Sequence, residues 1–311
     1  MLKDAAFAGG WSAVRRMPAG WSRAAFQAGG SYAARRDGPG VRQLRTNLAR
    51  VIAATPTLAG TDLDALTRAG MRSYARYWQE LFRLPSIPTG QILEQTRIED
   101  AQALRDLYAA GNGVILALPH SGNWDLAGAW LTASGIPFTT VAERLRPAAL
   151  FDRFVAFRES LGMEVIPLTG GAAPFELLAD RLRAGRALCL LADRDLPGTG
   201  RPVDFFGEPA PMPVGPALLA IRTGAPLVPV SLWFDDPAPW SGRIHAPIAD
   251  PGAGSLADRV SAMTQALADT FAGAIAQHPQ DWHMLARFWF ADRRPQRPET
   301  LTEVVAGEAG R

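Results

Sequence analysis

The spacing of hydrophobic and polar positions divides the chain into a helical first third and an alternating remainder. In the first third, apolar residues recur three or four positions apart, which is typical of amphipathic helices. This spacing predicts helices over residues 41–53 and 62–82, and the second helix has a broad apolar face that includes Tyr77. Pro85 and Pro88 end this region.

From residue 98 onward, short apolar runs alternate with helical patterns. The runs predict strands over residues 114–118, 138–142, 164–168, 187–192, 227–233 and 243–248. Helices are predicted from about residue 124 and over residues 150–161, 175–184, 214–223 and 256–277. This alternation favours an α/β fold with a largely parallel central sheet flanked by helices, next to a helical N-terminal region.

We expect three regions of one integrated domain. They are a helical, basic, membrane-facing region over residues 1–90, an α/β core over residues 91–291, and a flexible polar tail over residues 292–311. With 311 residues, 48% of them hydrophobic, the chain is long and apolar enough to bury one large core.

The N-terminal region combines aromatic side chains with basic ones. Residues 1–50 hold nine Lys and Arg against two Asp, a charge of +7, whereas the remainder of the chain sums to −5. The pattern predicts either a helical hairpin packed on the core or an anchor on an anionic membrane, and both can hold for different faces of one helix. Two groups separated by Pro18 form this pattern: Phe7, Trp11, Val14, Arg15 and Arg16, then Trp21, Arg23, Phe26, Tyr32, Arg35 and Arg36.

Other features narrow the class of protein. No apolar run reaches the roughly 18 residues of a membrane-spanning helix, and Arg15, Arg16 and Arg23 interrupt any signal-peptide core. The single cysteine, Cys189, can form no disulfide within the chain, and its apolar surroundings predict a buried strand residue rather than a nucleophile. We therefore expect a cytoplasmic protein that can lie on a membrane without crossing it.

The turn after the first long strand holds the strongest candidate for chemistry. Residues 120–125 read HSGNWD, an HxxxxD pattern at the carboxyl end of a strand, where ligands bind in parallel sheets. A turn of this length would bring the Asp125 carboxylate to one imidazole nitrogen of His120 and leave the other nitrogen free as a base. Amides over residues 121–124 would then face an oxyanion. The alternative is a surface turn in which Asp125 only serves the helix N-terminus.

A second polar cluster follows a later strand. Asp193, Arg194 and Asp195 predict either a site for a hydroxylated or phosphorylated headgroup or a salt-bridged strand end. The stretch VDFFGE over residues 203–208 predicts a compact apolar turn. The sequence has no phosphate-binding glycine loop, serine nucleophile elbow, zinc motif or nucleic-acid module, so we expect no metal and no nucleic-acid partner.

Several blocks together resemble the HxxxxD superfamily of glycerolipid and lipid A acyltransferases. They are LPHSGNWD at residues 118–125, ADRD at 192–195, VDFFG at 203–207 and RTGAPLVPV at 222–230. Five further blocks resemble the actinobacterial phosphatidylinositol mannoside acyltransferases within that superfamily: YARYWQELFRLP, FTTVAERL, FRESLG, PLTGG and DWHML. The resemblance covers nearly the whole chain before the tail.

This resemblance implies transfer of a long acyl chain, typically palmitoyl, from acyl-CoA to a mannose hydroxyl of a phosphatidylinositol mannoside. The enzyme would be peripheral, at the cytoplasmic face of the plasma membrane. Acyl-CoA is then the donor substrate, and no cofactor is expected. The other implied partners are the glycolipid acceptor and an anionic membrane surface.

The resemblance also implies roles for individual residues. His120 matches the general base of the family and Asp125 its partner carboxylate, while Arg158 and Asp193 match contacts to the acceptor sugar. The family has glutamate where this chain has Asp193, which is one methylene shorter and puts its reach in question. We place two further residues among the substrate-binding set, Arg194 and Asn123.

Two other functions are compatible with the sequence. One is acyl transfer to another lipid acceptor, such as a lysophospholipid or a lipid A precursor. The other is a non-catalytic lipid-binding protein at a membrane surface that has kept the fold. The presence of both His120 and Asp125 favours an enzyme.

Overall fold

A mixed sheet of mostly parallel strands lies at the centre of the computed structural model, which describes residues 13–142, 155–167, 174–196, 198–235 and 240–293. Within these ranges the sheet has seven strands in the order β1-β9-β8-β2-β5-β3-β4. Strands β8, β2, β5, β3 and β4 are parallel, while β9 is antiparallel to β8 and pairs with β1 in parallel. The strands are β1 (Thr96–Glu99), β2 (Val114–Leu118), β3 (Phe138–Ala142), β4 (Glu164–Pro167), β5 (Ala187–Leu191), β8 (Leu227–Phe234) and β9 (Trp240–Ile244).

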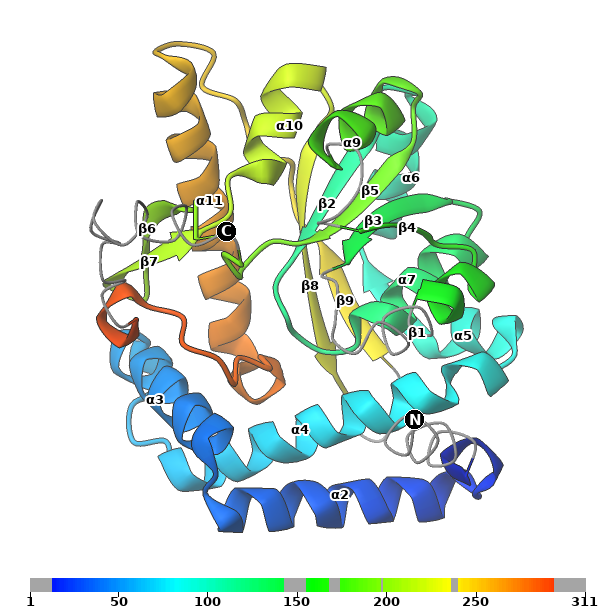
Figure 1. Ribbon diagram of the computed structural model, residues 1–311, viewed down its shortest axis with the longest axis vertical. Helices are drawn as coiled ribbons and strands as arrows, with labels where there is room; N and C mark the ends of the chain where they lie inside the picture. The colour runs from blue at the N-terminus through cyan, green and yellow to red at the C-terminus, as the bar shows by residue number, and fades with distance from the viewer. Residues whose placement is uncertain (1–12, 143–154, 168–173, 197, 236–239, 294–311) are drawn as a thin grey trace, which may run out of the picture.

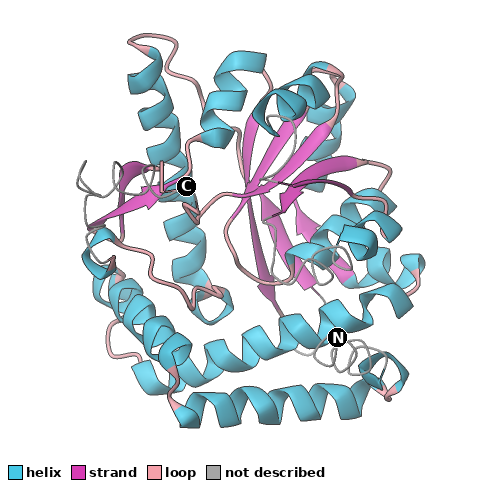
Figure 2. Cartoon of the chain, viewed as in Figure 1, coloured by secondary structure: helices cyan, strands magenta, loops and turns pink. Residues whose placement is uncertain are grey.

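Helices cover both faces of this sheet (Figures 1 and 2). Side chains alternate along a strand, so Ile115 and Ala117 of β2 face one helical layer while Val114 and Leu116 face the other. The first layer contains α9 (Pro174–Arg183), α10 (Gly215–Thr223) and α11 (Leu256–Gln277). The second contains α4 (Leu63–Arg83), α5 (Thr89–Gln95), α6 (Ala101–Ala109) and α7 (Trp124–Ala133). The predicted α/β fold with a largely parallel, helix-flanked sheet is confirmed.

The helical N-terminal region is also confirmed. Helix α2 (Ala19–Arg36) runs beside α4 (Figure 1), and α3 (Pro39–Ala54) also packs against α4. Phe26 of α2 contacts Phe82 of α4 edge to face, at 6.1 Å between ring centroids. Pro18 is the N-cap of α2, as the predicted break implies, whereas Phe7 and Trp11 lie outside the described residues.

Most predicted elements lie within two residues of their predicted bounds. The strands over 114–118 and 138–142 and the helix over 256–277 match fully. Residues 155–160 of the helix predicted over 150–161 are helical. Four predicted segments lie partly outside the described residues. They are the start of this helix, the end of the FTTVAERL block, most of PLTGG and most of the tail.

Two predicted segments need correction. The stretch predicted as a compact turn is the tip of a hairpin, β6 (Arg201–Phe205) and β7 (Glu208–Met212). Phe206 and Gly207 both have positive φ, 55° and 76°, as the two-residue turn of such a hairpin requires, but three prolines mask the strand pattern around it. The last strand, predicted over 243–248, is β9 at 240–244, because Pro247 has no N–H to extend the ladder.

A helix that crosses a membrane must be both long and apolar. Among the residues that the structure describes, no helix combines the length and the apolarity needed to cross a bilayer.

Candidate active site

Strand register brings a histidine and a carboxylate together at one edge of the sheet. Strands β2 and β5 are neighbours, and Leu118 of β2 pairs with Leu191 of β5. His120 and Asp193 each follow two residues after these paired leucines. The Nδ1 atom of His120 lies 2.5 Å from Oδ1 of Asp193, and the backbone N–H of His120 donates to Oδ2 at 2.9 Å.

Asp193 is therefore the partner carboxylate of His120 in this structure, whereas its predicted contact to the acceptor sugar stays a prediction. The Asp193 side chain is fully buried. Burial alone would raise its pKa, but the adjacent His120 ring and hydrogen bonds from His120 and Trp282 lower that pKa below its usual value. An ionised carboxylate at Nδ1 favours the tautomer with the proton on Nδ1 and a lone pair on Nε2. The shorter aspartate side chain, whose reach was in question, does reach His120.

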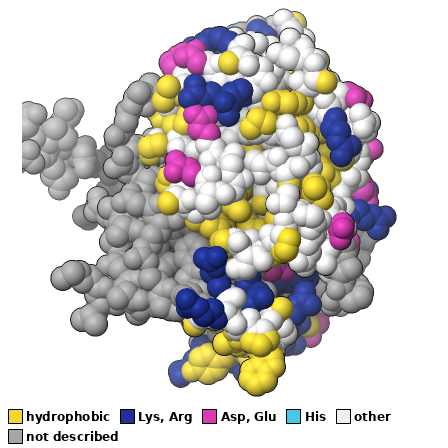
Figure 3. Space-filling model, turned by 90° about the vertical axis from the view of Figure 1, so that its right-hand side faces the viewer, with side chains coloured by type: hydrophobic (Ala, Val, Ile, Leu, Met, Phe, Trp, Pro, Cys, Tyr) yellow, Lys and Arg dark blue, Asp and Glu magenta, His cyan; other side chains and the backbone are white. Residues whose placement is uncertain are grey.

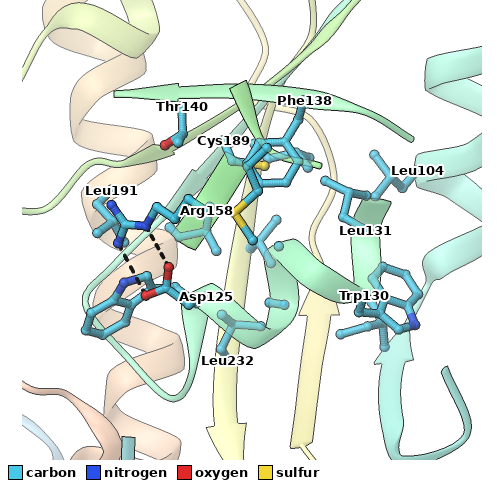
Figure 4. Close-up of a pocket in the computed structure, with 18 of the residues that line it drawn as sticks. Leu104, Asp125, Trp130, Leu131, Phe138, Thr140, Arg158, Cys189, Leu191 and Leu232 are labelled. Carbon is cyan, nitrogen blue, oxygen red and sulfur yellow. Dashed lines mark hydrogen bonds and ion pairs between the residues drawn. The ribbon is translucent and has the colours of Figure 1, made fainter. Parts of the chain in front are cut away.

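The predicted pairing of His120 with Asp125 is wrong for this structure. Asp125 accepts hydrogen bonds from Arg158, at 2.7 Å from Nε and 3.3 Å from Nη2, and from the Tyr77 hydroxyl at 2.9 Å. Helix α7 begins at Trp124, so Asp125 lies in its first turn and its side chain points to Arg158 rather than back over the loop (Figure 4). The Asp125 carboxylate raises the pKa of the Arg158 guanidinium further above its usual value.

The other predicted substrate-binding residues have different environments. The Asn123 side chain is buried, accepts from the Leu126 N–H at 3.0 Å as the N-cap of α7, and donates to Glu80 at 2.8 Å. Asn123 is thus engaged within the chain, which argues against a direct substrate contact. Arg194 is half-buried directly after Asp193. Arg158 lines a pocket next to α7, and 19% of its side chain is exposed.

The turn that carries His120 is tightly fitted. Gly122 has a positive φ of 59°, and a Cβ added there would lie 2.8 Å from the backbone carbonyl carbon of Leu232. The N–H of Ser121 donates to Pro119 and the N–H of Gly122 donates to Asp281. Because these two N–H groups already have acceptors, they are not free to donate to an oxyanion. The predicted oxyanion site is therefore limited to the N–H groups that follow them in the turn.

A buried polar cluster lies beneath this turn. The Ser73 hydroxyl lies 2.6 Å from Asp281 Oδ1 and 2.9 Å from His283 Nε2. Burial raises the pKa of Asp281 to about 6 and lowers the pKa of His283 to about 3. The His283 backbone N–H donates to the carbonyl of His120 at 2.8 Å. Asp281 and His283 belong to the DWHML block, and nothing in the residue pattern of that block shows its position under the turn.

An apolar pocket lies between α7 and the sheet (Figure 4). Trp124 lines it and also contacts His120 edge to face, at 5.4 Å between ring centroids, so the pocket lies next to the dyad. Cys189, predicted as a strand residue, lies in β5 and lines the pocket, where burial raises the pKa of its thiol. Polar groups at the pocket include Asp125, Arg158 and Thr140, and most other lining residues are apolar, among them Leu104, Leu116, Leu118, Leu131, Phe138, Met163 and Leu232.

Comparisons with known proteins identify the class of this chain. A family described as "Bacterial lipid A biosynthesis acyltransferase" matches residues 2–290. The chain belongs to this family and is an acyltransferase.

Within that class, the chain is similar to curated proteins from mycobacteria. A phosphatidylinositol mannoside acyltransferase of Mycolicibacterium smegmatis is 52% identical over 301 residues, which cover 96% of this chain and 95% of the relative. A phosphatidylinositol mannoside acyltransferase of Mycobacterium tuberculosis is 50% identical over 301 residues, which cover 96% of this chain and 92% of the relative. The resemblance drawn from the sequence blocks is thereby confirmed.

Proposed function

We propose that this acyltransferase moves a long acyl chain, palmitoyl as the first candidate, from acyl-CoA to a mannose hydroxyl of a phosphatidylinositol mannoside. The acceptor is supported by the names of the relatives at 52% and 50% identity. The observation that carries the mechanism is the hydrogen bond from His120 Nδ1 to the buried Asp193, beside an apolar pocket.

The reaction needs a base, because the acceptor hydroxyl must lose its proton as its oxygen attacks the thioester carbonyl. With Nδ1 held by Asp193, His120 offers the Nε2 lone pair to that proton. The new C–O bond forms, the carbonyl oxygen becomes an oxyanion, and its collapse breaks the C–S bond. The CoA thiolate leaves and takes the proton from Nε2, giving the acylated glycolipid and free CoA. A positioned base of this kind contributes about 10²- to 10⁴-fold.

The pocket beside the dyad suits the acyl chain of the donor. A chain of methylenes gains about 0.8 kcal/mol for each buried CH₂, so an apolar lining favours long chains. Arg158 at the pocket keeps its predicted role toward the acceptor sugar, since two of its N–H groups engage Asp125 and the others are available for hydroxyls. Arg194 likewise stays a predicted headgroup contact.

We further propose that α2 holds the enzyme on the anionic cytoplasmic face of the membrane. One face of α2 packs on α4, whereas Trp21 and Tyr32 are 76% and 55% exposed, and the exposed Arg36 donates a hydrogen bond to the Tyr32 hydroxyl at 2.7 Å. Figure 3 shows arginine and hydrophobic side chains together at the lower end of the molecule, where α2 lies. Exposed tryptophan and tyrosine on a helix that also exposes arginine fit the headgroup region of anionic lipids.

One assay tests donor, acceptor and base together. The full chain is incubated with radiolabelled palmitoyl-CoA and vesicles that contain phosphatidylinositol mannoside, a lysophospholipid or a lipid A precursor. We expect labelled product and free CoA with the mannoside, and a loss of transfer in His120→Ala that still folds. Transfer to another acceptor only would overturn the proposed acceptor, and undiminished transfer by His120→Ala would overturn the base.

A vesicle-binding assay tests the membrane proposal separately. Arg36→Gln should weaken binding to anionic vesicles about fivefold, and binding of the wild type should fall with salt. Trp21→Ala should also weaken it, whereas the control Leu256→Ala removes an exposed hydrophobic side chain from α11 and should not. Equal binding by Trp21→Ala and Leu256→Ala would contradict the assignment of α2 as the contact surface.

A further inference from the structure

The buried carboxylate of Asp193 accepts three hydrogen bonds, and one of them comes from outside the histidine. His120 supplies two, through its backbone N–H and its ring. The third comes from the indole N–H of Trp282, which lies 3.1 Å from Oδ2. The side chains of Asp193 and Trp282 are both 0% exposed. Water cannot replace a donor at such a site, so the indole is part of what keeps the charge stable there.

The Trp282 ring has little freedom to turn. It packs against Phe205, Phe288 and Trp289, at 6.0, 5.4 and 6.0 Å between ring centroids. These rings belong to the hairpin and to the segment after α11, and all are buried. Because the ring is fixed on these sides, the direction of its N–H toward Asp193 is fixed as well.

The backbone around Trp282 holds the other member of the dyad. The carbonyl of Asp281 accepts from the N–H of Gly122, and the N–H of His283 donates to the carbonyl of His120. Ser121 and Trp282 form an antiparallel bridge between these bonds. One short segment, residues 281–283, therefore contacts both the turn that carries His120 and the carboxylate that orients its ring.

We propose that Trp282 is a positioning residue for the His120–Asp193 dyad, acting through its indole N–H on the Asp193 carboxylate. This rests on the proposed function, in which His120 is the base. Trp282 touches neither the donor nor the acceptor in this account. Without the indole N–H, the negative charge of the Asp193 carboxylate would be stabilised by fewer hydrogen-bond donors. The His120–Asp193 dyad would then hold its proton more tightly.

The chain offers a matched control. Trp289 is also 0% exposed and belongs to the same aromatic cluster, but its indole N–H donates to the backbone carbonyl of Phe205 at 2.9 Å. Trp282→Phe and Trp289→Phe therefore each remove one buried indole N–H and a similar volume. His283, whose backbone N–H donates to the carbonyl of His120, is unchanged in both variants.

The test is the pH profile of kcat/KM for palmitoyl transfer, with thermal unfolding measured alongside. We expect Trp282→Phe to lose about tenfold in kcat and its acid limb to move about one pH unit upward. Trp289→Phe should lose stability to a similar degree with its acid limb unmoved. Identical profiles for the two variants would overturn the proposal.

Two further measurements separate the possible failures. If Trp282→Phe does not fold, benzothienylalanine at position 282 replaces only the N–H by sulfur, and the same shift is expected. An unmoved acid limb in that protein would overturn the role of Trp282. His120→Ala separates a failure of the proposed function from a failure of this inference. If His120→Ala keeps transfer, the proposed function fails. If His120→Ala is inactive but the acid limb of Trp282→Phe does not move, only this inference fails.

Discussion

Nδ1 of His120 lies 2.5 Å from Oδ1 of Asp193, although 73 residues separate the two in the sequence. The contact follows from the pairing of Leu118 with Leu191 in neighbouring parallel strands, since each site residue comes two positions after its leucine. The carboxylate that orients the histidine therefore comes from the adjacent strand. Asp125, the acidic residue of the HxxxxD pattern, instead holds Arg158.

We expect substitutions of Asp125 and Arg158 to have strongly coupled effects on the free energy of unfolding. Asp125 is 2% exposed, so Asp125→Ala leaves a mostly buried guanidinium unpaired and should cost about 3 to 5 kcal/mol of unfolding free energy. Arg158→Met should cost a similar amount, and the double variant should cost clearly less than the sum. Urea unfolding measures all three values.

The exposed pair of Arg183 and Asp180 is the control for that cycle. Its side chains are 52% and 61% exposed, and removing it should cost at most about 1 kcal/mol. Simple additivity of Asp125→Ala and Arg158→Met would contradict the description of Asp125 as the anchor of Arg158.

Gly128 predicts a length limit for the acyl chain. It lines the pocket from α7, and a Cβ there would lie 2.8 Å from Met163 Cε and 2.9 Å from Phe138 Cζ. Gly128→Ala should narrow the pocket and exclude about two methylenes, a loss of about tenfold in kcat/KM for palmitoyl-CoA. The loss for octanoyl-CoA should be much smaller.

Gly273→Ala is the matched control for this prediction. It is also a glycine within a helix, on the exposed side of α11, and an added Cβ there meets nothing within 4 Å. Both changes raise helix propensity by about 0.5 to 1 kcal/mol, but only the first enters the pocket. Equal donor preference in the two variants would argue that the acyl chain binds elsewhere.

His283 predicts a loss of stability on acidification. Burial lowers its pKa to about 3 in the folded chain, below the unfolded value of 6.5. Below pH 6.5 the unfolded chain therefore binds a proton that the folded chain does not, so the free energy of unfolding falls as the pH falls toward 3. This contribution amounts to about 2 kcal/mol between pH 7 and pH 5.

Chemical unfolding of wild type and His283→Gln over pH 4 to 7 checks this. The variant should lack the His283 contribution, so the stability difference between the two proteins should shrink on acidification. Asp281 gives a slope of the opposite sign between about pH 4 and 6, because burial raises its pKa to about 6, and both proteins retain it. A stability difference that does not change with pH would contradict the buried, neutral state of His283.

The sequence predicts the sheet and the position of His120 well, because both depend on local patterns. Apolar runs of five residues read as strands, and the turn after 114–118 carries the glycine that its backbone needs. Strand order is not a local property: β5 lies beside β2 although β3 and β4 come between them in the chain. For that reason the sequence could not show that Asp193, rather than Asp125, reaches His120.

Two other features were hidden for different physical reasons. Helix α7 begins one residue before Asp125, and this start decides where the Asp125 side chain points. Trp282 reaches the dyad from the far end of the chain, directly after a single 3-10 turn, Pro279–Asp281, which is too short for a hydrophobic period to predict it. If the register between residues 114–118 and 187–191 were known, it would place Asp193 beside His120. Each of the two residues follows the end of one of these paired strands.

The most direct test of the central claim compares kcat for palmitoyl transfer in Asp193→Asn and Asp125→Asn. If His120 and Asp193 form the catalytic dyad, Asp193→Asn favours the wrong tautomer and lowers kcat by about 10³- to 10⁴-fold. Asp125→Asn keeps a side chain of the same shape beside Arg158 and should stay at least about tenfold more active than Asp193→Asn. A folded Asp193→Asn enzyme with kcat near that of the wild type, or the reverse order of the two variants, would contradict the dyad.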